Sequence, residues 1–214
     1  MASFKIVVAR YNEPIEWLKV LINDCVIYNK GSPLNIKNEV LLENVGRESD
    51  SYLNYIITNY NNLPDVVIFT QANISDHNME NNVNYLLSIA NSANTHKKSK
   101  NYSTNYLRHN DDVGEYSCFE GKWNVLKDGT YFLNDNYKNN VPVAFDDWFR
   151  EHIQPDYPNP IHVYCNAIFS VKKELILRNS IEYYKRLILE VNHHINSTEG
   201  HFLERSWYYI FNDH

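Results

Sequence analysis

"FKIVVAR", residues 4–10, is an almost uninterrupted run of apolar and β-branched residues. Such a run is typical of a strand that is buried on both faces of a parallel sheet. The polar break "YNEP" follows it, and after the break comes "IEWLKVLIN", residues 15–23. Trp17, Leu18, Leu21 and Ile22 recur there at helical spacing. A strand followed by a helix in this way begins a β-α-β unit.

The same alternation continues for the first third of the chain. "CVIYNKG" reads as a second strand, "SPLNIKNEVLLE" as a connector, "DSYLNYIITNY" as a helix capped by Ser49 or Asp50, and "DVVIFTQ" as a third buried strand. Alternating strands and helices predict a mixed, mostly parallel sheet with helices on its faces.

The rest of the chain divides into a polar middle and an ordered end. A helix is predicted over residues 78–93, then an insertion or lid over about 94–145 with short strands in "KWNVL" and "TYFLN". A short helix at 145–153, a strand at 161–171 and helices at 180–195 and 197–211 follow, with Ser197 or Thr198 as the last cap. We expect one domain over residues 1–214, with a β-α-β-α-β half at 1–77 and a second half at 146–214.

Composition narrows the function classes. The net charge of -6 argues against general nucleic-acid binding. The three widely spaced cysteines, Cys25, Cys118 and Cys165, argue against a disulfide scaffold and fit a reducing compartment. No signal peptide and no apolar run of about 20 residues is recognisable. We therefore expect a cytoplasmic protein without a transmembrane segment.

Polar residues follow the first predicted strand, at the edge of the sheet where ligands of α/β proteins bind. Asn12 and Glu13 can hydrogen-bond a base or a ribose, next to Tyr11, and Arg10 can contact a phosphate with two hydrogen bonds. The alternative is a polar turn in which Glu13 favours the following helix dipole.

"ENVGRES", residues 43–49, carries more polar groups than a simple turn requires. Asn44 precedes Gly46, which permits a positive φ or a close backbone approach. Arg47 can bind a diphosphate, with Glu48 and Asp50 beside it. The alternative is a helix entry with acids in its first turn. A cation is unfavourable at that position, which favours a functional role for Arg47.

Two further segments carry possible metal ligands. In "QANISDH", residues 71–77, Asp76 and His77 can bind a divalent cation, or Asp76 can cap the next helix. In "FDDW", Asp146 and Asp147 can act as a base or as metal ligands, or lie in a solvated turn.

The last candidate group lies in "EGHFLERSW", residues 199–207. Glu199 and His201, with Glu204 and Arg205 one turn later, can face one cavity. A Glu near a His suits proton abstraction from a hydroxyl. The alternative is a surface Glu–Arg pair with Phe202 and Trp207 in the core.

Taken in order, "KIVVARYNE", "ENVGRESDSYLNYI" and "LPDVVIFTQ" resemble the nucleotide-binding half of family 2-type glycosyltransferases with the GT-A fold. Together with a late "FSV" and a final "ER.W..IF", these motifs are similar to the DUF3431 proteins, which have been regarded as glycosyltransferase-like. The similarity spans most of the chain and is weakest in the middle.

The resemblance implies a GT-A-like fold and a transferase that uses a UDP- or GDP-type nucleotide sugar and a glycan or other hydroxyl acceptor. By position, Tyr11, Asn12 and Glu13 would contact the nucleoside. The base, ribose or diphosphate would lie near Asn44, Gly46 and Arg47, and we expect Arg10, Gln71, Asn73 and Arg205 in the same donor site. Glu199 would be the acceptor base, with Asp147 and His201 as further catalytic candidates.

One departure concerns the metal. GT-A enzymes carry Asp-x-Asp where this chain has Gln71-Ala72-Asn73, and amides are weaker ligands for Mn²⁺ or Mg²⁺ than carboxylates. Asp76 and His77 are candidate replacements; otherwise the enzyme is metal-independent.

Two other classes of function remain open. The first is a non-catalytic nucleotide- or carbohydrate-binding domain that lost the metal motif. The second is a metal-dependent hydrolase built on Asp76, His77, Asp146, Asp147 and His201.

Overall fold

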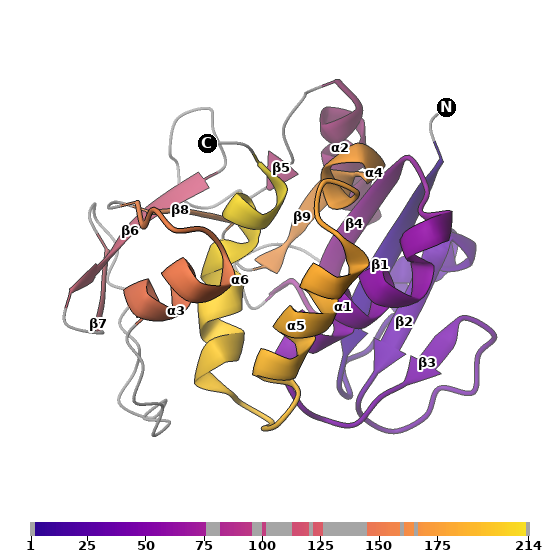
Figure 1. Ribbon diagram of the computed structural model, residues 1–214. Coiled ribbons are helices and arrows are strands. Elements are labelled where there is room, and N and C mark those ends of the chain that lie inside the picture. The colour runs from indigo at the N-terminus through magenta and orange to yellow at the C-terminus, as the bar shows by residue number, and fades with distance from the viewer. Residues whose placement is uncertain are drawn as a thin grey trace.

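A mostly parallel sheet forms the centre of the protein (Figure 1). The computed structural model describes residues 3–75, 82–95, 100–101, 113–119, 122–125, 145–158, 161–164 and 167–212. Within these residues, six strands pair in the order β3-β2-β1-β4-β9-β5. β1, β2, β3 and β4 run parallel, while β9 is antiparallel to both of its neighbours. The strands are β1 (Phe4–Arg10), β2 (Cys25–Asn29), β3 (Glu39–Leu41), β4 (Val66–Gln71), β5 (Lys100–Asn101) and β9 (Phe169–Lys172).

Both faces of this sheet are buried. Successive side chains of a strand point to opposite faces, so Val7 of β1 packs in one apolar cluster and Ile6 and Val8 pack in the other. This double burial explains why the first strand reads as an apolar run with no polar alternation.

Helices cover each face. α1 (Arg47–Asn59), α5 (Ile181–Val191) and α6 (Thr198–Phe211) pack on one side, in front of the sheet in Figure 1. The 3₁₀ helix η1 (Glu16–Asp24) and α2 (Val83–Thr95) supply Leu18, Leu86 and Ile89 to the cluster on the other side.

A second sheet of three strands lies beside α6, in the order β7-β6-β8 among the described residues. Its strands are β6 (Val113–Phe119), β7 (Lys122–Val125) and β8 (Ile161–Tyr164). Two of them, β6 and β7, come from the region predicted as an insertion, and β6 pairs with both β7 and β8, which belongs to the second half of the chain. The remaining elements are α3 (Phe145–His152), α4 (Lys173–Ile176) and the short 3₁₀ helix η2 (Tyr60–Asn62).

The mixed α/β class, the mostly parallel sheet and most predicted elements are confirmed, but four local predictions were wrong. The segment predicted as a helix at 15–23 is a 3₁₀ helix, in which Leu18 and Leu21 share one face because the repeat is three residues. The connector at 32–43 contains β3. The strand predicted at 161–171 is two strands in different sheets, with Ala167 at a φ of 53° between them. The predicted strand "TYFLN" lies outside the described residues.

The fourth correction concerns the start of α1. Neither Ser49 nor Asp50 caps it, because the helix begins at Arg47 and its N-cap is Gly46. By contrast, Ser197 caps α6 as predicted, since its hydroxyl accepts a hydrogen bond from the Gly200 amide at 3.1 Å.

Candidate functional site

A polar cavity of about 200 Å³ lies at the carboxyl edge of the main sheet. In the sheet, β2 lies on one side of β1 and β4 lies on its other side. The strand order therefore reverses between β1 and β4, and α/β proteins bind ligands at such a topological switch point. The cavity is lined by Ala9, Arg10, Tyr11, Glu13, Lys30, Asn44, Arg47, Glu48, Ser51, Gln71 and Asn73.

The structure thus brings together many of the site residues that the sequence predicts. The predicted residues on the cavity are Arg10, Tyr11, Glu13, Asn44, Arg47, Gln71 and Asn73. Asn12 and Gly46 are next to cavity residues without lining it themselves, and Glu199, His201, Arg205 and Asp147 do not line it either. Asp76 and His77 lie outside the described residues.

The loop after β1 is organised by its own polar side chains. Arg10 Nε donates to the Glu13 carbonyl at 2.8 Å, and its Nη1 donates to Asn29 Oδ1 at 2.8 Å. Asn12 Oδ1 accepts from the Ser32 amide at 2.9 Å, and Glu13 Oε2 accepts from the Tyr11 amide at 2.7 Å. The arrangement leaves Tyr11 50% exposed at the cavity.

The turn before α1 has a strained backbone. Gly46 has a φ of 64°, as predicted, and a Cβ there would lie 2.6 Å from Asp50 Cβ. Arg47 also has a positive φ, of 50°. For a residue other than glycine this conformation costs about 1–3 kcal/mol, and such strain concentrates at functional sites.

Lys30 ties the end of β2 to the start of α1. Its Nζ lies 2.8 Å from Asp50 Oδ2, and it donates to the Arg47 carbonyl at 2.6 Å and to the Val45 carbonyl. Both side chains of the ion pair are 5% exposed. Burial lowers the pKa of Lys30, and the charge of Asp50 opposes that shift.

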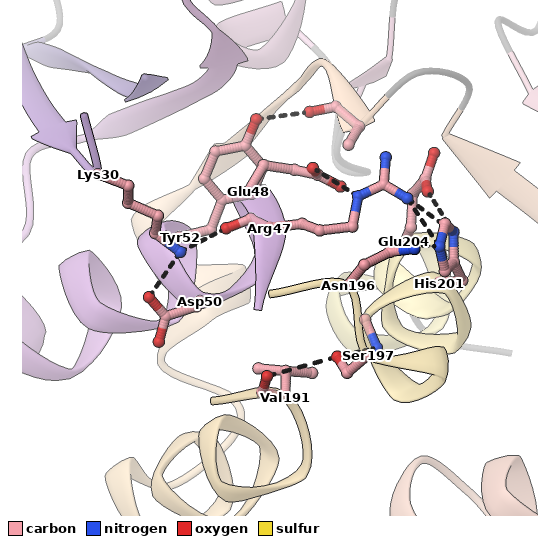
Figure 2. A network of polar contacts seen from close by, with 12 residues as sticks. Lys30, Arg47, Glu48, Asp50, Tyr52, Val191, Asn196, Ser197, His201 and Glu204 are labelled. Atoms are coloured by element: carbon pink, nitrogen blue, oxygen red, sulfur yellow. Dashed lines mark hydrogen bonds and ion pairs between the residues drawn. The ribbon is translucent and has the colours of Figure 1, made fainter. Parts of the chain in front are cut away.

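The Arg47 guanidinium is held from two sides (Figure 2). Its Nε lies 3.6 Å from Glu48 Oε2, and its Nη1 lies 2.8 Å from Nδ1 and 2.9 Å from Nε2 of His201 on α6. The side chain is still 29% exposed. A positioned cation with this exposure can meet an anionic group in the cavity.

His201 is neutral in the folded protein. Burial, and then the positive charge of Arg47, lower its pKa to about 3. A neutral imidazole has one N–H donor and one acceptor nitrogen. Because Nε2 lies 3.0 Å from Asn196 Oδ1, we assign the N–H to Nε2, which leaves Nδ1 to accept from Arg47.

Glu48 and Ser51 are two buried polar residues of the cavity wall. Glu48 is 8% exposed, and burial raises its pKa, while the charge of Arg47 opposes that shift. Ser51 is fully buried. Among the described residues, neither Glu48 Oε1 nor Ser51 Oγ has a hydrogen-bond partner.

The remaining candidates lie away from the cavity wall. Glu199, in the first turn of α6, is 3.6 Å from His193, and Arg205 donates to the His201 carbonyl at 2.9 Å. Asp147 is 71% exposed on α3 and 3.6 Å from Arg150, which also pairs with Asp146 at 3.0 Å. In the part of the chain that the structure describes, no group of three His, Cys, Asp or Glu residues is placed to hold a metal ion.

Sequence reasoning missed three polar cavity residues as site residues: Lys30, Glu48 and Ser51. Lys30 follows a predicted strand in "YNKG", so its position at a strand end was a usable signal. Glu48 was considered as a partner of Arg47 or as an acid in the first turn of the helix. Ser51 gives no sequence signal, because a serine inside a helix has no special pattern.

The fold and the cavity define an α/β protein with a polar cavity at a topological switch point of its sheet. A family model described as "Protein of unknown function (DUF3431)" matches residues 6–214, and the chain belongs to this family. Comparisons with curated proteins and with solved structures found no match. None of the described helices is long and apolar enough to span a membrane.

Proposed function

We propose that the protein is a glycosyltransferase with a GT-A-like fold, which transfers a sugar from a nucleotide sugar to a hydroxyl acceptor. The observation that carries the proposal is the position of Arg47, a partly exposed cation on a polar cavity at the carboxyl edge of the sheet. The motif similarity to family 2-type glycosyltransferases supports the same class of reaction.

The charges of the cavity suit a diphosphate. Its lining holds three cations, Arg10, Lys30 and Arg47, and two carboxylates, Glu13 and Glu48, in a protein of net charge -6. Arg10 is 9% exposed and the Lys30 side chain 5%, whereas the Arg47 side chain is 29% exposed, so Arg47 is the cation assigned to the ligand. A fixed cation stabilises the charge that develops on a leaving diphosphate.

In the proposed reaction, the acceptor oxygen attacks the anomeric carbon, and the bond from that carbon to the diphosphate oxygen breaks. A carboxylate takes the acceptor proton. Glu199 is the proposed base, because its side chain is only 12% exposed and it lies in the same first turn of α6 as His201, while Asp147 is the second candidate. Mn²⁺ or Mg²⁺, held by Asp76 and His77, would add to the charge stabilisation by Arg47.

A thermal-shift panel tests the proposal. The full chain is heated with nucleoside diphosphates and with UDP- and GDP-sugars, each with and without Mn²⁺. A ligand at about 100 times its Kd stabilises the folded state by about 2.7 kcal/mol, which raises Tm by several degrees. Selective stabilisation by one nucleotide sugar is expected, and its Mn²⁺ dependence tests the metal. A flat panel at millimolar ligand would overturn the proposal.

A second candidate is a non-catalytic binding domain. The observation that favours it is the Gln71-Ala72-Asn73 segment at the end of β4, where GT-A enzymes carry carboxylates. Binding of a nucleotide sugar without release of its nucleoside diphosphate, with a panel of sugar acceptors present, would support this candidate. Turnover of any donor would exclude it.

A further inference from the structure

Two polar groups of the cavity wall have no hydrogen-bond partner in the described part of the chain. Glu48 Oε1 and Ser51 Oγ are buried, lie one helical turn apart on α1, and lack a hydrogen-bond partner among the described residues. A buried polar atom that is left unpaired costs about 1–3 kcal/mol. Such a cost at two positions of one cavity suggests that a ligand supplies the missing hydrogen bonds.

The usual partner of a helical serine is already taken at Ser51. A serine inside a helix commonly donates to the carbonyl four residues earlier, as Ser206 does to Phe202 at 2.8 Å. For Ser51 that carbonyl belongs to Arg47, and it accepts from Lys30 Nζ at 2.6 Å. Lys30 therefore already engages the carbonyl that Ser51 would otherwise use, and no hydrogen bond joins Ser51 Oγ to it.

Only one of the two carboxyl oxygens of Glu48 has a partner among the described residues. Oε2 faces the Arg47 guanidinium at 3.6 Å, while Oε1 is left for another group. A carboxyl group can accept a hydrogen bond from an alcohol when it is ionised and can also donate one when it is protonated. A serine hydroxyl likewise donates and accepts, so both groups suit a ligand hydroxyl better than an anion.

We propose that Glu48 and Ser51 form a hydroxyl-binding floor of this cavity, which holds sugar hydroxyls of a ligand whose phosphate lies against Arg47. The ligand class is a sugar phosphate, in which hydroxyl and phosphate groups are separated by one or a few carbon atoms. This inference rests on the proposed function for the larger ligand, the nucleotide sugar, and adds which side chains read the sugar part. The hydroxyls can belong to the ribose or to the transferred sugar.

Calorimetric titration tests the floor with five probes: inorganic pyrophosphate, glucose 1-phosphate, UDP, 2′-deoxy-UDP and UDP-glucose. The proteins are the wild type, Ser51→Ala, Glu48→Gln and Ser49→Ala. Ser49 is the matched control on α1, because its hydroxyl is also fully buried and has no hydrogen-bond partner in the described segments, but it does not line the cavity.

We expect Ser51→Ala to weaken the sugar-containing probes about two- to tenfold, the effect of one hydrogen bond, and to leave pyrophosphate unchanged. Glu48→Gln should weaken the same probes without weakening pyrophosphate, and Ser49→Ala should change none of them. If a variant binds UDP more weakly than the wild type does but binds 2′-deoxy-UDP equally well, the floor holds the ribose. A loss seen with glucose 1-phosphate or UDP-glucose but not with UDP assigns it to the transferred sugar.

Several outcomes would overturn the floor: an equal loss for pyrophosphate and the sugar probes, no loss in either variant, or no sugar probe binding more tightly than pyrophosphate. The failure of the proposed function is distinguishable from these. Binding of glucose 1-phosphate that depends on Ser51, in a protein that binds no nucleotide sugar, would support the floor and refute the transferase. Nucleotide-sugar binding that neither Ser51→Ala nor Glu48→Gln affects would refute the floor and support the transferase.

Discussion

Nη1 of Arg47 lies 2.8 Å from Nδ1 of His201, although 154 positions separate the two residues. This contact joins the first turn of α1 to the first two turns of α6 (Figure 2). Because His201 is neutral, it can hold the guanidinium by a hydrogen bond without neutralising its charge. The contact with His201 therefore positions the guanidinium without adding to the negative charge that Glu48 places beside it.

The first prediction concerns the charge of Arg47. Arg47→Ala should weaken binding of pyrophosphate and UDP about ten- to a hundredfold, because charge-assisted hydrogen bonds contribute about 1.5–3 kcal/mol. Arg150→Ala is the control, since Arg150 is an exposed arginine on α3 that does not line the cavity. Calorimetric titration of both variants measures the difference. Equal affinity of Arg47→Ala and wild type would remove Arg47 from the site.

The second prediction concerns the turn before α1. Gly46→Ala should lower the free energy of unfolding by more than about 1 kcal/mol, because φ is 64° and the new Cβ would lie 2.6 Å from Asp50 Cβ and 2.9 Å from the Val191 carbonyl oxygen. Gly200→Ala is the matched change, since Gly200 lies in a helical turn and its Cβ would approach only Ser197 Oγ, at 3.0 Å. Urea denaturation compares the two, and a larger loss for Gly200→Ala would contradict the argument.

The sequence was sufficient to place this turn and the edge of the sheet. Polar residues after buried strands predicted the cavity wall, and a cation at a helix start marked Arg47 as unusual. The type of η1 was not predictable, because helical periods of 3.0 and 3.6 residues differ little over nine residues.

The site contacts that the sequence did not predict join segments that are far apart in the chain. The pairing of Lys30 with Asp50 requires the end of β2 to lie beside the start of α1, and no local pattern encodes that neighbourhood. His201 was predicted as part of a cluster with Glu199 and Arg205 that can face a cavity. The structure places its ring against Arg47 instead, because packing of α6 on α1 decides which residues meet.

The third prediction tests that buried pair. Lys30→Met should lower the free energy of unfolding by about 3–5 kcal/mol, because it leaves the Asp50 carboxylate buried without its cation. Lys185→Met removes an ion pair with Glu182 whose side chains are 54% and 67% exposed, and such pairs contribute at most about 1 kcal/mol. Urea denaturation of both variants at one pH gives the comparison. Similar losses in the two variants would show that the Lys30 pair is not a main support of α1.

The fourth prediction follows from the neutral His201. Burial, and then the charge of Arg47, lower its pKa to about 3, whereas the pKa in an unfolded chain is about 6.5. Between these values the unfolded state binds a proton that the folded state does not. The free energy of unfolding therefore falls as the pH is lowered through this window, by up to about 1.4 kcal/mol per pH unit.

The variant His201→Gln has no titratable group at this position, so its stability should depend less on pH between about 6.5 and 4 than that of the wild type. Burial raises the pKa of Glu48, which stabilises the folded state as the pH falls, but both proteins carry that opposite contribution. The charges of Arg47, Glu204 and Arg205 act on the ring in the wild type, and these residues are unchanged in the variant. Urea denaturation at several pH values measures both slopes. If the slopes are the same, His201 is protonated in the folded protein, and its hydrogen bond to Arg47 is not the one assigned here.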